Sequence, residues 1–129
     1  MKLLIDSDIL IEVSRGRDPM VIRDWKALSV SSSVLSCSPV TVAELWHGGL
    51  PEERDALEDL FAALLCLPVD HSIGRLAGDY LRRYRRSYSL ALGDALIAAT
   101  STVHSAPLWT RNRKHYPMRE VSFWDRVVE

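Results

Sequence analysis

Apolar residues recur along this chain with two different spacings, and these spacings predict strands that alternate with helices. Short apolar runs flanked by turn residues predict buried strands. The predicted strands span 2–6, 32–38, 66–70 and 107–110, with a candidate fifth strand at 120–124. Apolar residues three and four positions apart predict helices with one buried face. The predicted helices span 7–15, 18–28, 39–49, 51–65, 71–87 and 92–105.

The order of these segments predicts the fold class. Strands that alternate with helices require crossover connections and therefore a mostly parallel sheet. We expect an α/β domain of three layers, with four to five strands in the central sheet and helices on both faces. A length of 129 residues and a hydrophobic content of 47% suit a single globular domain over residues 1–129.

The segment "LLIDSDIL", residues 3–10, places Asp6 and Asp8 inside a run of large aliphatic residues. An unpaired buried carboxylate is costly, so such a group is normally paired, neutralised or bound to a metal. In a parallel sheet, the carboxyl ends of the strands open into a crevice where ligands bind. Asp6 stands where the first apolar run ends, so we expect it at the rim of this crevice.

Two further acids from distant segments are expected at the same edge of the sheet. Glu44 lies in the short helix after the second strand, and Asp94 lies in the first turn of the helix that leads to the fourth. Carboxylates that converge raise one another's pKa unless a cation offsets their charge. Oxygen ligands favour a hard ion, Mg²⁺ or Mn²⁺, and a water activated by such an ion suits phosphodiester hydrolysis.

Each of these acids also has a purely structural interpretation. Asp6 or Ser7 could cap the first helix. Thr41 and Glu44 have the spacing of a capping box, and an acid such as Asp94 is favoured in a first turn by the helix dipole. The two interpretations are compatible, because a cap and a metal ligand both place the carboxylate at a helix N-terminus beside a strand end.

Four segments occur in an order and at spacings that resemble the PIN-domain family, and more narrowly the VapC-type toxins of bacterial and archaeal toxin–antitoxin pairs. They read "LLIDSDILIE", "SPVTVAELWHGG", "LALGDALIAAT" and "PLWTRNRKHY". The resemblance implies a Mg²⁺- or Mn²⁺-dependent endoribonuclease in which a metal-activated water cuts RNA and leaves 5′-phosphate and 3′-hydroxyl ends. It also implies a homodimer and a small antitoxin that silences the toxin, and an acidic crevice suits arginine side chains from such a partner.

The resemblance assigns metal binding and catalysis to Asp6, Glu44 and Asp94. Ser7 corresponds to the small hydroxyl residue that follows the first acid. The fourth segment departs from the family's pattern, since Asn112 and His115 stand where the family often has a further acid. We expect Asn112 to complete the metal shell or orient a water, or else only to shape the turn, and Asp8 to assist from outside the shell.

Charge is divided unevenly along the chain. Residues 1–70 hold 6 Lys and Arg and 12 Asp and Glu, whereas residues 71–129 hold 10 and 5, so the halves carry −6 and +5. A basic half could hold a polyanion, although the asymmetry could also be surface charge without a partner. The candidate contacts to RNA phosphates follow the fourth predicted strand and are Arg111, Arg113, Lys114 and His115.

The segment "YLRRYRRSY", residues 80–88, places Tyr80, Tyr84 and Tyr88 at helical spacing with arginines between them. One interpretation is an RNA-binding face with stacking aromatic rings. The other is a tyrosine stripe in the core or at a dimer contact, with solvated arginines, and we favour packing.

Two other functions are compatible with these patterns. One is a catalytically degenerate PIN-like domain that only binds a partner. The other is a phosphatase of the haloacid-dehalogenase type, whose D-x-D motif resembles Asp6-x-Asp8, although Leu10 stands where that family has Thr or Val.

No apolar run is long enough to cross a membrane, and the acids Asp6, Asp8 and Glu12 argue against a signal peptide. We therefore expect a cytoplasmic protein in which Cys37 and Cys66 are buried free thiols.

Overall fold

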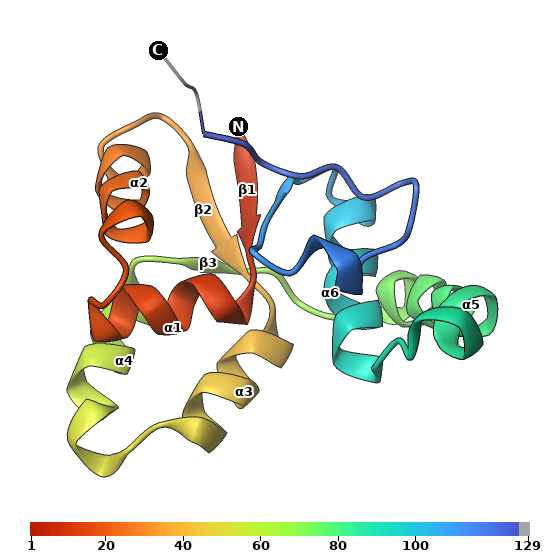
Figure 1. Ribbon diagram of the computed structural model, residues 1–129, viewed down its shortest axis with the longest axis horizontal. Coiled ribbons are helices and arrows are strands. Elements are labelled where there is room, and N and C mark those ends of the chain that lie inside the picture. The colour runs from red at the N-terminus through yellow and green to blue at the C-terminus, as the bar shows by residue number, and fades with distance from the viewer. Residues whose placement is uncertain (127–129) are drawn as a thin grey trace.

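The computed structural model describes residues 1–126, and its centre is a sheet of four parallel strands (Figure 1). The strand order is β3-β2-β1-β4, so the first strand of the chain lies inside the sheet. The strands are β1 (Lys2–Ile5), β2 (Val34–Cys37), β3 (Leu65–Cys66) and β4 (Leu108–Trp109). The predicted α/β class and parallel arrangement are confirmed.

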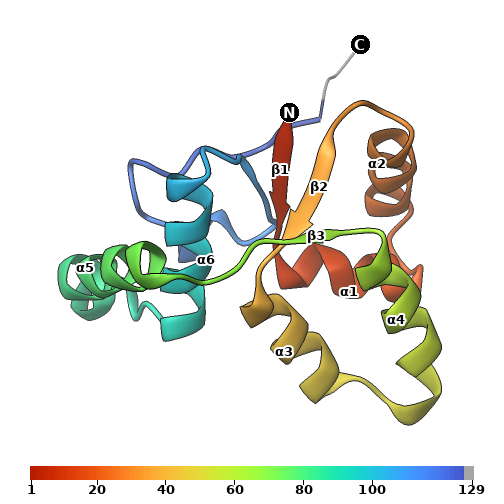
Figure 2. The same cartoon turned by 180° about the vertical axis from the view of Figure 1, so that it is seen from behind.

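Within residues 1–126, six α-helices connect and cover the strands, on both sides of the sheet (Figures 1 and 2). They are α1 (Ser7–Arg15), α2 (Pro19–Ser29), α3 (Pro39–Gly48), α4 (Arg54–Ala62), α5 (His71–Tyr88) and α6 (Leu92–Val103). The helices α1 to α4 lie on one side, and α5 and α6 pack together on the other. This arrangement is the three-layer architecture that the alternating pattern predicts.

The side chains of β1 alternate between two hydrophobic cores. Leu4 packs into the core built largely by α5 and α6, whereas Leu3 and Ile5 pack into the core built by α1, α2 and α4. All three are fully buried. Successive side chains of a strand point to opposite faces, so a strand buried on both sides reads as a continuous apolar run.

Local signals in the sequence correctly mark the first two helices. Gly16 ends α1 with φ of 65°, a left-handed conformation that glycine adopts without the steric cost of a Cβ. The side chain of Asp18 accepts hydrogen bonds from the backbone N–H groups of Met20 and Val21 at the start of α2, and Pro19 occupies the first helical position.

The prediction of one helix over 51–65 is wrong at both ends. The segment begins with a 3₁₀ turn, η1 (Pro51–Glu53), continues as α4, and ends early enough for Leu65 to enter β3. In β3, Leu65 and Cys66 pair with Ser36 and Cys37 of β2. Pairing with a neighbouring strand thus overrides the helical pattern at the end of this segment, since propensity is a weak determinant beside tertiary context.

The third and fifth predicted strands are shorter than the sequence suggests. β3 has two residues rather than the predicted 66–70, because Pro68 has no N–H group for a ladder and Asp70 already caps α5 through the backbone N–H of Ile73. Of the candidate strand 120–124, the described residues retain a single parallel bridge between Leu108 and Phe123. A second 3₁₀ turn, η2 (Arg113–His115), lies between these partners.

The two cysteines lie directly opposite each other on β2 and β3. Cys37 is buried, as predicted, but Cys66 is exposed, so the prediction of two buried thiols is half wrong. Burial, together with the neighbouring Cys66, raises the pKa of the Cys37 thiol to about 12. Cys37 therefore stays protonated and unreactive in the folded protein near neutral pH.

Within residues 1–126, no helix combines the length and the apolar character that a bilayer span requires.

Candidate functional site

The carboxyl ends of the parallel strands position the candidate site, beginning with Asp6 directly after β1. Asp6 is the N-cap of α1, and its Oδ1 accepts a hydrogen bond from the backbone N–H of Ser7 at 2.8 Å. The capping interpretation of Asp6 is therefore confirmed. Capping occupies only Oδ1, which leaves Oδ2 for partners from other segments.

Two hydroxyl groups from the other end of the chain hold the second oxygen of Asp6. The side chains of Thr110, directly after β4, and Tyr116 each donate to Oδ2 of Asp6 at 2.8 Å. Burial and the nearby carboxylates of Asp6 and Asp94 raise the pKa of the Tyr116 hydroxyl, so it remains a neutral donor. The side chain of Asp6 is thus buried but satisfied by three donors.

Ser7 joins α1 to the acid of α3. Its hydroxyl donates to Oε1 of Glu44 at 2.8 Å and lies 3.1 Å from Oγ1 of Thr41. The N-cap of α3 is Ser38, whose side chain accepts from the backbone N–H of Val40, so the capping-box interpretation of Thr41 and Glu44 is wrong. Glu44 instead points from the body of its helix toward the first residue of α1.

Asp94 lies in the first turn of α6 and is affected by both other acids. Burial raises the pKa of its carboxyl group most, the charges of Asp6 and Glu44 raise it further, and His115 opposes the rise. The Nδ1 atom of His115 lies 3.8 Å from Oδ2 of Asp94. The three acids therefore interact electrostatically, although they come from three separate segments.

The donor chemistry of this cluster fits a hard divalent cation. As the side chains lie, no three Asp, Glu, His or Cys residues within 1–126 close around one point. Glu44 is turned toward Ser7, and both oxygens of Asp6 are engaged with hydroxyl and amide donors. The cluster nevertheless offers only oxygen donors and an excess of negative charge that raises the pKa of Asp94, which is the environment that Mg²⁺ or Mn²⁺ would neutralise.

Asp8 anchors the segment that follows β4. Its Oδ2 accepts from the backbone N–H of Arg111 at 2.9 Å and from Nδ2 of Asn112 at 3.2 Å. Burial and the charge of Asp6 raise the pKa of Asp8, while the contacts with Arg111 lower it. Asn112 thus reaches the acidic cluster through Asp8, and its amide nitrogen, not its oxygen, makes the contact.

The two arginines predicted as phosphate contacts already have carboxylate partners. Arg111 lies 3.0 Å from Asp18, 3.5 Å from Glu12 and 3.9 Å from Asp8. Arg113 pairs with Asp125 and lies over the ring of Phe123, with 4.9 Å between its guanidinium carbon and the ring centroid. Lys114 is exposed and makes no ion pair with any residue in 1–126, and His115 lies beside Asp94.

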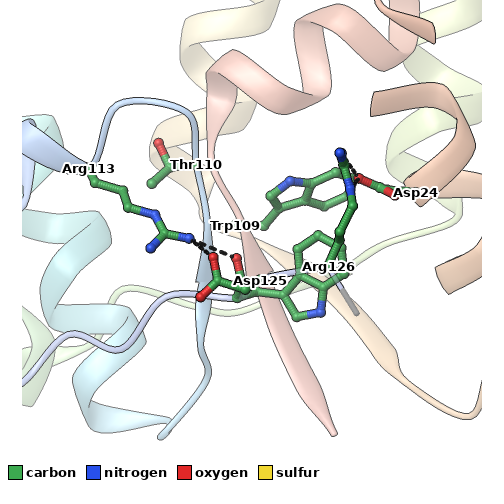
Figure 3. A pocket seen from close by; sticks show the side chains of 7 residues that line it. Asp24, Trp109, Thr110, Arg113, Asp125 and Arg126 are labelled. Atoms are coloured by element: carbon green, nitrogen blue, oxygen red, sulfur yellow. Dashed lines mark hydrogen bonds and ion pairs between the residues drawn. The ribbon is translucent and has the colours of Figure 1, made fainter. Parts of the chain in front are cut away.

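A pocket of about 500 Å³ opens beside this segment, next to the acidic cluster. Its lining residues are Asp24, Trp109, Thr110, Arg113, Trp124, Asp125 and Arg126. Figure 3 shows Arg113 pointing toward Asp125 and Arg126 pointing toward Asp24, so both guanidinium groups in the pocket are neutralised. Thr110 links the pocket to the site, because the hydroxyl group that donates to Asp6 belongs to a lining residue.

Two residues of the site were missed at the sequence level. Thr110 and Tyr116 both lie in the segment "PLWTRNRKHY", but neither their residue type nor their spacing indicates a role at the site. Their importance depends on contacts with Asp6 across more than 100 residues.

Comparisons with known proteins agree on one family. The family model described as PIN domain matches residues 3–122. The chain is 42% identical over 119 residues to Ribonuclease VapC10 of Mycobacterium tuberculosis, covering 92% of this chain and 88% of that protein. It is 35% identical over 116 residues to Ribonuclease VapC19 of the same organism, covering 89% and 92%.

Solved structures share the fold at low sequence identity. A crystal structure of VapBC2 from Rickettsia felis, bound to a DNA fragment from its promoter, matches with a TM-score of 0.81 and 18% identity over 97% of this chain and 100% of that one. A DNA-bound VapBC structure from Salmonella typhimurium also has a TM-score of 0.81, with 17% identity over 97% and 98%. These matches support the fold described above.

Proposed function

Because this chain belongs to the PIN-domain family, we propose that it is a metal-dependent endoribonuclease and the toxin of a toxin–antitoxin pair. The observation that carries the proposal is the acidic cluster at the carboxyl edge of the sheet. Asp6 caps α1, Glu44 accepts from Ser7 beside it, and Asp94 lies in the first turn of α6 with a pKa that burial and both of these acids raise. Relatives with 42% and 35% identity are named ribonucleases, which supports the same activity here. The match to the PIN domain favours this function over the phosphatase alternative.

Asp6, Glu44 and Asp94 would hold Mg²⁺ or Mn²⁺. When bound, such an ion lowers the pKa of a water and polarises a phosphoryl oxygen, which are the requirements of phosphodiester hydrolysis. The choice of ion follows from the all-oxygen donor set, since carboxylates suit hard cations.

Neighbouring side chains orient these acids. Thr110 and Tyr116 fix the plane of the Asp6 carboxylate, and Ser7 holds Glu44 toward the strand edge. Such support is typical of metal sites, where partners behind the ligands set their orientation and basicity. Asp8 and Asn112 support the site indirectly. The hydrogen bond between them holds the segment that contains Thr110, and Thr110 in turn donates to Asp6.

Contacts to the RNA at the site itself would come from the edge of the acidic cluster. Lys114 is exposed and free of ion pairs within 1–126, so it is the best placed of the four predicted phosphate contacts. Arg111 and Arg113 would have to exchange a carboxylate partner for a phosphate, and His115 lies closer to Asp94.

The partner that we propose is an antitoxin with arginine side chains. A guanidinium group pairs bidentately with carboxylates, so it competes with a metal for an acidic cluster. One solved structure described as a toxin–antitoxin complex and another described as a member of a family of toxin–antitoxin systems support a partner of this class. We also propose a homodimer, which light scattering would detect as twice the chain's 14.6 kDa.

Cleavage of labelled RNA by the purified protein tests this function. We expect cleavage with Mn²⁺ or Mg²⁺ and none with EDTA. Asp94→Asn should abolish cleavage and weaken Mn²⁺ binding in calorimetry by at least about tenfold, because it removes one of three charged ligands. Asp59→Asn, an exposed acid on α4, is the matched control and should behave like the wild type.

Full activity of Asp94→Asn, or undiminished cleavage in EDTA, would contradict the proposed site. Tight Mn²⁺ binding by the wild type without cleavage of any RNA would instead favour the degenerate binding domain.

A further inference from the structure

The outer surface of α5 presents several exposed arginine side chains that have no carboxylate partner within 1–126. These side chains are Arg75, Arg82, Arg85 and Arg86. We call these four residues the α5 basic face. Of the nine other arginines, Arg54 and Arg119 also make no ion pair within 1–126, and seven are paired with carboxylates: Arg15, Arg17, Arg23, Arg83, Arg111, Arg113 and Arg126. Four of the six arginines that make no ion pair within 1–126 therefore lie on this one helix.

The tyrosine stripe of α5 explains why these arginines point outward. Tyr80 is fully buried, and its hydroxyl lies 2.9 Å from Oγ1 of Thr102 on α6. Tyr84 is half-buried and packs against Tyr80, with 6.3 Å between ring centroids. The packing interpretation of the stripe is thus confirmed for these two residues. Since the aromatic side of the helix faces α6, the arginines on its other side face solvent.

One arginine of the segment has a structural role that separates it from the basic face. Arg83 lies 5.2 Å from the ring centroids of Tyr80 and Tyr84 and pairs with Asp79 and Glu120. Asp79 is the single acid within α5. Arg85 and Arg86 stand three and four positions after Arg82, and like charges at these spacings in a helix are mutually unfavourable. A ligand that brings negative charge would relieve this repulsion.

The surface is also hollowed along the helix. A depression of about 600 Å³ is lined by His71, Ser72, Arg75, Leu76, Asp79 and Arg82. Two of the four arginines of the basic face therefore border a concave surface. Such a surface suits a flexible chain of phosphates better than a flat face does.

The end of α5 leads directly to the candidate site. Tyr88 ends this helix, and α6, whose first turn contains Asp94, begins at Leu92. Figures 1 and 2 show α5 packed beside α6. Tyr88 is 55% exposed although its ring lies 6.0 Å from that of Tyr84, so the exposed part of the ring can stack on a base at the point where α5 approaches the site.

We propose that the α5 basic face binds the phosphate backbone of the RNA substrate outside the cleavage site, with Tyr88 stacking on a base between the two. This inference rests on the proposed function and extends it by naming the surface that holds the substrate. Charge complementarity selects this surface, because residues 1–70 carry a net charge of −6 and repel RNA.

Binding of single-stranded RNA in the absence of cleavage tests the inference. The background is Asp94→Asn, and the probe is a fluorescein-labelled RNA of 20 nucleotides followed by anisotropy at several KCl concentrations. The test variant adds Arg82→Gln, Arg85→Gln and Arg86→Gln. The matched control adds Arg15→Gln, Arg17→Gln and Arg23→Gln, which remove the same charge from paired arginines.

We expect the test variant to bind RNA at least about tenfold more weakly, and the slope of log K against log salt to fall by about 2, since each phosphate contact on a single strand contributes about 0.7. The control should stay within about twofold of the background. In the active protein, the test substitutions should raise KM for the same RNA more than they change kcat.

An unchanged affinity and salt slope in the test variant would overturn the inference. So would a change from dimer to monomer in light scattering, because α5 would then be a contact between protein chains. Because the test measures binding, its failure is distinguishable from the failure of the proposed function, which is measured by cleavage.

Discussion

At the scale of single residues, the hydrogen bonds of Asp6 explain why a carboxylate can lie at the end of a buried strand. Its side chain accepts from the backbone N–H of Ser7 and from the hydroxyls of Thr110 and Tyr116, each at 2.8 Å. A buried carboxylate with several donors is far less costly than an unpaired one. The same donors fix the orientation in which the carboxylate would meet a metal.

Replacing Tyr116 by Phe should test this orienting role. Tyr116→Phe removes one donor to Asp6, and hydrogen bonds to charged groups contribute about 1.5–3 kcal/mol, so the free energy of unfolding in urea should fall by about that amount. Mn²⁺ affinity measured by calorimetry should fall as well, because Asp6 is less well held. Tyr84→Phe is the control, since the Tyr84 hydroxyl makes no hydrogen bond within 1–126. Wild-type Mn²⁺ affinity in Tyr116→Phe would argue against the orienting role.

The raised pKa of Asp94 predicts how stability depends on pH. Burial raises this pKa above its ordinary value of 3.8, and Asp6 and Glu44 raise it further. An acid whose pKa is higher in the folded state contributes stability that is complete below its unfolded pKa and is lost as pH rises through the folded pKa. Without metal, Asp94→Asn should therefore gain Tm over the wild type as pH rises from about 4 to 7.

Thermal unfolding with EDTA across this pH range measures the difference, with Asp59→Asn as the control. Saturating Mn²⁺ at neutral pH should reverse the order, because the wild type alone keeps all three charged ligands and a bound ligand stabilises the folded state. A gap in Tm that stays constant from acid to neutral pH would show that folding does not raise the pKa of Asp94.

At the scale of elements, Arg111 joins three parts of the fold. It follows β4, pairs with Asp8 and Glu12 of α1, and reaches Asp18, the N-cap of α2. These contacts are partly exposed, so each is individually weak. Together they hold the segment after β4 against the beginning of α1, where Asp6 lies.

Arg111→Ala should destabilise the fold by about 1 kcal/mol more than Arg17→Ala, which removes a single partner, Glu12. The excess should shrink in about 1 M salt, because screening weakens partly exposed ion pairs. Urea unfolding at low and high salt measures both effects. Equal losses for the two variants would mean that Arg111 acts as an isolated surface pair.

At the scale of the whole molecule, the uneven charge along the chain places the acidic and the basic half on opposite sides of the sheet. The acidic half contains α1 to α4 on one side of the sheet, and the basic half contains α5 and α6 on the other (Figure 2). The candidate site lies where the halves meet, since Asp6 and Glu44 belong to one half and Asp94 to the other. A basic antitoxin segment and an RNA chain would therefore approach from different sides.

Hydrogen exchange with the proposed antitoxin partner would test this separation. We expect protection of backbone amides at the start of α1 and of α6, where Asp6 and Asp94 lie, because an arginine bound there excludes solvent. Amides of α5 should exchange as in the free protein. Inhibition with protection confined to α5 would contradict an antitoxin arginine at the acidic cluster.

The fold class and several helix ends of this protein can be predicted from the sequence alone, because they depend on the local preferences of short segments. The alternation of apolar runs with helical spacing predicts the three-layer fold, and Gly16, Asp18 and Pro19 mark helix ends through their own backbone preferences. The expectation that Asp6, Glu44 and Asp94 lie near one edge also follows from local information, since in a parallel sheet every strand presents its carboxyl end to the same crevice, although within 1–126 no three such side chains close around one point.

The tertiary structure decided what depends on contacts between distant segments. The register of β2 and β3 brings Cys37 and Cys66 face to face and ends α4 early. Tyr116 reaches Asp6 across 110 positions, and Arg111, a candidate for phosphate contact by sequence, is occupied by three carboxylates. Neither periodicity nor capping encodes such pairings, because they depend on the free energy of packing the whole chain rather than on the preference of any one segment.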